Sequence, residues 1–254
     1  MRDVLLNHQI WWLAVLMLII FVAGFFQSAA GFGFALFAVP VGAMIVTPRD
    51  VVVSVFLTSC VISLVLTRTQ REHIVWSEAK RLSIGAVSAM PLGVWLLQSG
   101  SESMLRLVLG ISTTAAALWS LVMVSRLRRP WADTNLLGGL VGAVSGVLNT
   151  SLATNGPPLV VYLQGRQLTP DQFRATISLV FSVSNAIGLI MLLGGRAIQV
   201  VDVELFASTL LAAAAGTALG FRQGAKINKR HFGLMVNILL LLGGLTSLVR
   251  AFFS

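Results

Sequence analysis

Long apolar stretches alternate with short polar or turn-forming segments along the whole chain. Apolar stretches can be delimited at about 10–27, 32–46, 51–67, 82–98, 104–125, 134–149, 157–165, 173–193, 203–221 and 232–250. Most of them approach the ~20 residues with which a helix crosses a bilayer. The stretch 157–165 is too short to span alone, and its Pro157-Pro158 start is typical of the first turn of a helix. The pattern predicts an all-α integral membrane protein with roughly eight full spans and two broken or re-entrant helical elements.

The two halves of this pattern repeat one another. Thr47-Pro48 closes one apolar stretch, and Thr169-Pro170 closes another 122 residues later. A break rich in small residues precedes each Thr-Pro, at 27–33 in the first half and at 149–158 in the second. Farther on, six residues return at an offset of 127: Leu107, Ile111, Leu118, Ser120, Leu121 and Val122 recur as Leu234, Ile238, Leu245, Ser247, Leu248 and Val249. Such duplication, interrupted at matching places, is typical of secondary transporters, and it predicts two transmembrane repeats, 1–127 and 128–254.

The positions of Lys and Arg distinguish two arrangements of these repeats. If each half has four spans, the basic residues divide ten to eight between the two sides of the membrane. If each half has five elements, they divide thirteen to five, and the minority is Arg2, Arg49, Arg106, Arg196 and Arg250. Cytoplasmic loops carry the excess of positive charge, so five elements are favoured. The halves would then be inverted repeats that enter the membrane in opposite directions, with both termini in the periplasm.

Composition agrees with a membrane protein and narrows the partners. The chain is 56% hydrophobic and 11% charged, with a mean hydropathy of +0.88, which a soluble domain does not need. The net charge of +9 lies in short loops between apolar stretches, so it indicates cytoplasmic loops and not a nucleic-acid partner. Membrane lipid and a small anionic substrate are the expected partners. The single cysteine, Cys60, cannot form an intrachain disulfide.

The breaks are where a ligand is expected. A helix that begins in mid-membrane directs its unpaired N–H groups and the positive end of its dipole at the break. Two such starts are expected, near Phe34 and near Pro157, and together they would form a site for an anion. Glycines let the backbone approach the ligand, and amides and hydroxyls donate hydrogen bonds to its oxygens. The candidate binding residues are Gln27, Ser28, Gly31, Phe32, Gly33, Phe34, Asn149, Thr150, Ser151, Thr154, Asn155, Gly156 and Pro157.

Tight helix packing is the alternative explanation for small residues in membrane helices. It is preferred for the glycines spaced four apart, which are Gly138, Gly142 and Gly146 in one stretch and Gly216 and Gly220 in another. These faces serve contacts within the chain or in a homodimer, and the sequence leaves both open. At the breaks, polar amides and hydroxyls accompany the glycines, and packing alone would not need them.

Ionisable residues are absent from the centres of the predicted spans. Every Asp and Glu, and all three His, lie at or near a span end. A carboxylate at mid-membrane is usually retained for proton or cation traffic, so a cation carrier and a proton antiporter built on a buried carboxylate are disfavoured. Proton coupling through a protonatable substrate remains open. An enzyme would need a nucleophile or a metal cluster within the spans, where Cys60 stands alone. The sequence therefore predicts neither an enzyme nor a metal site, and no cofactor.

The motifs at the breaks resemble a known family. Gly31-Phe32-Gly33-Phe34 is followed by Pro40, and Ser145-Gly146 is followed by Thr154-Asn155-Gly156-Pro157-Pro158 and Tyr162. These paired motifs resemble the signatures of the TauE/SafE family of sulfite and organosulfonate exporters, over essentially the whole chain. One departure concerns the first break, where Phe32 and Phe34 alternate with glycine in place of a denser glycine run, so pocket shape and substrate size remain open.

The resemblance implies a function. It implies alternating-access transport of small sulfur-containing anions, such as sulfite, sulfoacetate or thiosulfate, across a bacterial inner membrane, and export as the direction. An uptake permease or a channel-like carrier for another small anion is the alternative, because the sequence does not fix the direction of transport.

Overall fold

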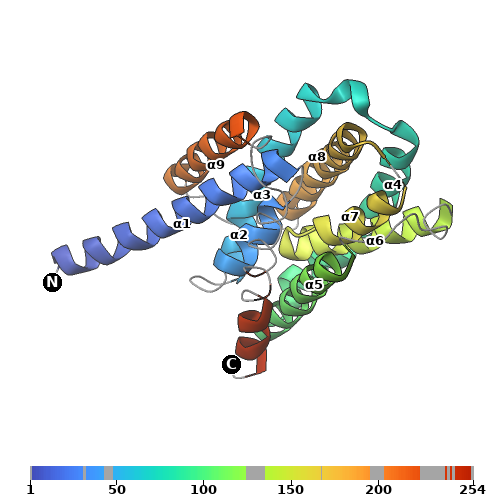
Figure 1. Cartoon of the computed structure of the whole chain (residues 1–254). Coiled ribbons are helices and arrows are strands. Elements are labelled where there is room, and N and C mark those ends of the chain that lie inside the picture. The colour runs from blue at the N-terminus through green and yellow to red at the C-terminus, as the bar shows by residue number, and fades with distance from the viewer. Residues whose placement is uncertain are drawn as a thin grey trace.

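A computed structural model describes residues 2–30, 33–42, 48–123, 135–166, 168–194, 203–223, 238, 241 and 244–252. These residues are helical apart from short connections (Figure 1). The helices are α1 (Arg2–Ala30), α2 (Phe34–Gly42), α3 (Pro48–Thr69), the short 3₁₀ helix η1 (Arg71–His73), α4 (Trp76–Ser99), α5 (Glu102–Met123), α6 (Asn135–Leu152), α7 (Gly156–Gly165), α8 (Pro170–Gly194) and α9 (Val203–Gln223), with further helix at 244–252. The predicted all-α class is confirmed for this part of the chain.

The helices differ from the predicted apolar stretches at some ends. By length and hydropathy, α4 and α8 qualify as membrane spans among the described residues, and four shorter apolar stretches lie at Ala14–Ser28, Val55–Thr69, Leu136–Leu152 and Ala207–Gly220. The prediction of eight full spans stays a prediction. The α4 helix begins at Trp76, six residues before the predicted stretch at 82, and its first two turns contain Glu78 and Arg81, which form an ion pair.

The helix boundaries follow the two offsets of the sequence repeat. The starts of α2 and α7, at Phe34 and Gly156, are 122 residues apart. The described part of α1 ends 122 residues before the end of α6, and the described part of α3 begins 122 residues before the start of α8. The described part of α9 begins 127 residues after the start of α4. Both offsets are those of the duplicated motifs, so the same local structure forms twice from matching sequence.

The equivalent helices α3 and α8 pack against each other in antiparallel orientation. Asn185 Nδ2 on α8 donates a hydrogen bond to Ser63 Oγ on α3 at 3.3 Å, and these two residues are 122 apart. Four residues later on α3, Thr67 Oγ1 lies 2.7 Å from the hydroxyl of Ser182, which precedes Asn185. Positions therefore rise on α3 as they fall on α8. Ser63 is therefore in direct contact with its own repeat counterpart, Asn185.

Glycines bring two other helix pairs into close contact. A Cβ on Gly146 of α6 would overlap the carbonyl group of Ala86 on α4. The equivalent contact recurs between Gly24 of α1 and the carbonyl oxygen of Ala213 on α9. In Figure 1, α9 lies alongside α1 as these contacts require. The packing role predicted for the glycines spaced four apart is confirmed, since Gly142, Gly216 and Gly220 also lie against backbone carbonyl oxygens of neighbouring helices.

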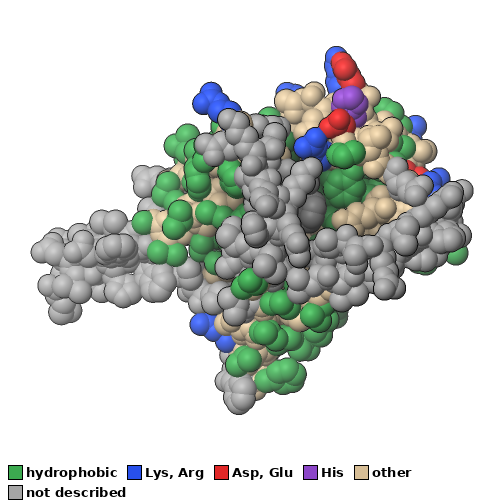
Figure 2. Space-filling model, in the orientation of Figure 1, with side chains coloured by type: hydrophobic (Ala, Val, Ile, Leu, Met, Phe, Trp, Pro, Cys, Tyr) green, Lys and Arg blue, Asp and Glu red, His purple; other side chains and the backbone are tan. Residues whose placement is uncertain are grey.

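Polar side chains are buried while large apolar ones face outward. The buried polar side chains include Gln27, Asn149, Thr150, Asn155, Thr176 and Asn185. The exposed apolar side chains include Leu18, Leu64, Ile84, Trp95, Leu140, Ile190, Leu211 and Phe252. Figure 2 shows such apolar surface over much of the described part of one face, with charged side chains gathered at the end near the α3–α4 connection. Lipid accommodates this distribution, because apolar surface faces hydrocarbon and polar groups bond internally.

Candidate functional site

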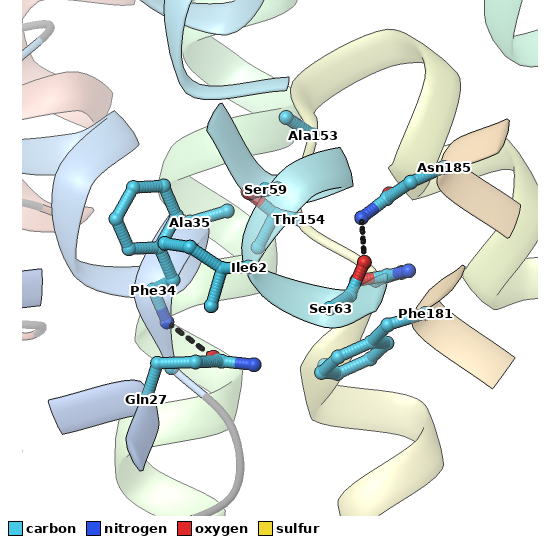
Figure 3. Close-up of a pocket in the computed structure, with 13 residues that line it drawn as sticks. Gln27, Phe34, Ala35, Ser59, Ile62, Ser63, Ala153, Thr154, Phe181 and Asn185 are labelled. Atoms are coloured by element: carbon cyan, nitrogen blue, oxygen red, sulfur yellow. Dashed lines mark hydrogen bonds between the residues drawn. The ribbon is translucent and has the colours of Figure 1, made fainter. Parts of the chain in front are cut away.

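The two breaks of the repeat lie at one pocket (Figure 3). Its cavity measures about 20 Å³, which is room for about one water molecule. The lining comes from α1, from the starts of α2 and α7, and from the middle of α3 and α8. The residues are Gln27, Gly33, Phe34, Ala35, Ser59, Ile62, Ser63, Ala153, Thr154, Asn155, Gly156, Phe181 and Asn185. The helix starts predicted near Phe34 and Pro157 thus lie at the same pocket.

Gln27 organises the first break. It is 3% exposed, and its Oε1 accepts a hydrogen bond from the backbone N–H of Phe34 at 3.0 Å (Figure 3). This bond satisfies one of the unpaired N–H groups with which α2 begins. Gly33 joins the two helices with a φ of 108°, a conformation that strains any residue with a Cβ. Because the carbonyl end of the Gln27 amide is fixed at α2, its NH₂ end is left as a donor at the pocket.

The second break is a tight hairpin between α6 and α7. Ala153 ends α6 in the left-handed region, with a φ of 54°, and its N–H donates to the carbonyl oxygen of Asn149 at 2.8 Å. Ser145 Oγ on α6 donates to the carbonyl oxygen of Asn155 at 2.9 Å. These bonds hold the start of α7 against α6, and Pro157 in the first turn of α7 needs no partner for its nitrogen.

Asn155 directly precedes α7, and its side chain is buried at the start of that helix. It is 6% exposed and makes no capping bond to the helix. Within the described chain, its Nδ2 is buried and has no hydrogen-bond partner. A buried amide donor without a partner is costly, and it indicates a group that a ligand or water would satisfy. Asn155 is therefore the strongest ligand candidate at the second break.

The thirteen predicted site residues differ in where the structure places them. The pocket is lined by six of them: Gln27, Gly33, Phe34, Thr154, Asn155 and Gly156. Ser28, Thr150 and Ser151 lie outside that lining, with their hydroxyls donating to helix carbonyl oxygens of Phe25, Met90 and Val147 respectively. Pro157 lies just beyond Gly156 and does not line the pocket. Gly31 and Phe32 lie outside the described residues.

Asn149 also lies outside the pocket lining, in the interior between helices. It is completely buried, and both its side-chain nitrogen and its side-chain oxygen lack a partner among the described residues. A Cβ on Gly188 of α8 would lie 3.5 Å from Nδ2 of Asn149. Asn149 is the repeat counterpart of Gln27, 122 residues later, so the same position carries a buried amide in both halves.

Sequence reasoning did not identify the α3 and α8 residues at the pocket. These are Ser59, Ile62 and Ser63 on α3, and Phe181 and Asn185 on α8. The repeat offset was a usable signal, because Ser59 and Phe181, like Ser63 and Asn185, are 122 residues apart. A polar residue near the centre of an apolar stretch was a second signal, and Asn185 has that position in 173–193.

The electrostatics of the pocket come from dipoles. The described lining residues carry no charged side chain. Positive potential is supplied by the N-terminal ends of α2 and α7, which begin at Phe34 and Gly156 in the lining. Amide NH₂ groups of Gln27, Asn155 and Asn185 supply hydrogen-bond donors. This combination suits a small oxyanion, which helix N-termini bind without a formal positive charge.

The sequence of the chain is similar to those of known proteins. The family described as "Sulfite exporter TauE/SafE" matches residues 16–247. A Cupriavidus necator protein named as a probable sulfite/organosulfonate exporter TauE is 25% identical over 169 residues, which are 64% of this chain and 65% of that relative. No solved structure matches the chain.

Proposed function

Since the chain belongs to the sulfite exporter TauE/SafE family, we propose that it is a secondary transporter that moves small sulfur-containing anions across the bacterial inner membrane, in the direction of export. Sulfite, sulfonates such as sulfoacetate, and thiosulfate are the proposed substrates. The observation that carries the proposal is the buried side-chain nitrogen of Asn155, which has no hydrogen-bond partner among the described residues and lies at a pocket where two helices begin. The Cupriavidus necator relative, named as a sulfite/organosulfonate exporter, supports the class of cargo.

The proposed binding mode follows from the donors at the pocket. Each helix N-terminus contributes up to about 2 kcal/mol to binding an anion in a partly buried geometry. The amides of Gln27 and Asn155 would donate to substrate oxygens, and Ser63 and Asn185 would complete the shell from the opposite side. The cavity of about 20 Å³ is too small for a sulfonate, so this conformation would be a closed one that expands on binding.

We propose alternating access between two inverted repeats as the mechanism. The repeated helix boundaries support two structural copies, and the antiparallel packing of α3 and α8 supports their inversion. The pocket includes Ser63 and Asn185, which lie on the axis between the copies. A site on that axis can face either side of the membrane as one copy rocks against the other.

The first test is anion transport into proteoliposomes, measured for sulfite, sulfoacetate, taurine, thiosulfate, sulfate and chloride. Asn155→Ala should reduce transport of the preferred anion by about ten- to a hundredfold, because a hydrogen bond to a charged group contributes about 1.5–3 kcal/mol. Gln164→Ala, an exposed amide on the same helix, is the matched control and should transport at the wild-type rate. Equal transport rates for Asn155→Ala and Gln164→Ala would show that Asn155 does not bind the anion. Transport of chloride alone would show that the protein carries another class of anion.

Inversion of the repeats is tested by labelling single cysteines from each side of the membrane. Gln98 and Arg222 are exposed residues at corresponding ends of the equivalent helices α4 and α9. In a Cys60→Ser background, Gln98→Cys should react with an impermeant maleimide from the periplasm, and Arg222→Cys should react from the cytoplasm. Reaction of both from the same side would exclude the inverted arrangement.

A further inference from the structure

An ionic cluster around a buried carboxylate lies outside the pocket, where side chains of α4 and α7 meet. Glu78, in the first turn of α4, is 2% exposed. Its carboxylate accepts hydrogen bonds from Arg81 Nη1 at 3.2 and 3.3 Å, from the hydroxyl of Tyr162 at 2.9 Å, and from Arg166 Nη2. The Glu78 cluster consists of these four residues: Glu78, Arg81, Tyr162 and Arg166. Two cations and one hydroxyl thus converge on a single buried carboxylate, and the proposed binding mode uses none of them.

The cluster joins α4 to the end of α7 that lies away from the pocket. Tyr162 and Arg166 belong to the last turn of α7 and its C-cap, whereas Asn155 and Gly156 at its other end line the pocket. With only ten residues, α7 spans about 15 Å and moves as one rigid piece. A bond that fixes its C-terminal end therefore also fixes the position of the pocket residues at its N-terminal end.

The sequence positions that correspond to the cluster in the other half lack its charged residues. The repeat offsets place Pro40 and Met44 at the positions of Tyr162 and Arg166, and Leu205 and Ser208 at those of Glu78 and Arg81. None of these four side chains is charged. In a protein built from inverted repeats, equivalent positions lie at opposite sides of the membrane. Ion pairs of this kind would therefore hold one opening of the pathway and not the other.

We propose that the Glu78 cluster is a latch that holds the C-terminal end of α7 on α4 and opens when the transporter loads its anion from the cytoplasm. Glu78, Tyr162 and Arg166 are positioning residues that act through α7. The proposal rests on the proposed function, whose charge distribution puts Arg81 and Arg166 on the cytoplasmic side. Removing the carboxylate leaves two guanidinium groups facing each other without a counter-ion, which separates α7 from α4.

The test reads the accessibility of the pocket from each side. Ser59 lines the pocket on α3, so Ser59→Cys in a Cys60→Ser background is the reporter. An impermeant thiol reagent is applied to inside-out and right-side-out vesicles, without substrate. Glu78→Gln should raise the labelling rate from the cytoplasmic side about tenfold and lower it from the periplasmic side. Glu78→Asp, which keeps the charge, should restore most of the wild-type asymmetry.

The controls separate a latch from general loosening. Glu102→Gln makes the same chemical change at an exposed carboxylate, whose Oε2 lies 3.6 Å from Arg106 Nη2, and it should leave labelling unchanged. Tyr162→Phe removes one hydroxyl and keeps the ring, and it should shift labelling in the same direction if Glu78→Gln yields no folded protein. If Glu78→Gln leaves the labelling rate unchanged, or raises it equally from both sides of the membrane, the proposal of a latch is wrong. The labelling experiment is done without substrate. A wild-type protein that transports no sulfonate would therefore contradict the proposed function, but it would not change the labelling result for Glu78→Gln.

Discussion

Gly146→Ala is expected to lower the melting temperature of the purified protein by roughly 6–12 °C, the effect of about 3 kcal/mol in a chain of this size. A Cβ at Gly146 on α6 would overlap the carbonyl carbon, carbonyl oxygen and Cα of Ala86 on α4. Backbone atoms cannot rotate away as a flexible side chain does, so the two helices have to separate. The measurement is thermal unfolding in detergent, followed by size-exclusion chromatography of the heated sample.

The control for this prediction lies on the same helix. Gly139 has open space where its Cβ would be, so Gly139→Ala should leave the melting temperature unchanged or raise it slightly, because alanine favours a helix by about 1 kcal/mol over glycine. Gly24→Ala, the repeat counterpart of Gly146→Ala, should be destabilising as well, since Gly24 meets Ala213 in the same way. Equal melting temperatures for Gly146→Ala and Gly139→Ala would mean that the α4–α6 contact is looser than the structure has it.

Helix positions were predictable from the sequence to within a few residues at most described boundaries. The apolar pattern located the short second element of each half, and Pro157-Pro158 marked the start of α7 within one residue of Gly156. The start of α4 was not predictable in this way. Hydropathy excludes Glu78 and Arg81 from a span, and the burial of Glu78 is made favourable by partners that include Tyr162 and Arg166, 84 and 88 positions away.

The candidate site was predictable in part, and for a definite physical reason. The breaks are local features, so their glycines and amides are visible in the sequence, and the structure brings Gln27 and Asn155 to one pocket. The direction in which a hydroxyl points, by contrast, depends on helices that are distant in the sequence. Thr150 donates to Met90 on a different helix because a close α4–α6 contact puts that carbonyl oxygen within 2.9 Å. The contribution of Asn185 likewise depends on the crossing of α8 with α3.

Gln27→Glu is expected to reduce anion transport by a factor on the order of one hundred or more while the protein stays folded. A carboxylate oxygen keeps the acceptor that Phe34 N–H uses at 3.0 Å, so the start of α2 remains capped. The same change removes the NH₂ donor and adds a negative charge, which the N-terminal ends of α2 and α7 stabilise. Two unit charges about 5 Å apart at an effective dielectric constant of 20 repel by about 3 kcal/mol, so the substrate anion is excluded.

Proteoliposome uptake and thermal unfolding, measured on the same preparations, distinguish this exclusion from damage to the fold. Gln164→Glu places the same negative charge on the exposed face of α7 and should change neither quantity. Gln27→Ala removes both the donor and the cap, so it should lower the melting temperature as well as transport. Transport by Gln27→Glu within twofold of the wild-type rate would mean that the anion does not approach this amide. The pocket at the two breaks would then be a closed packing defect on the repeat axis, and the pathway would have to lie elsewhere between the repeats.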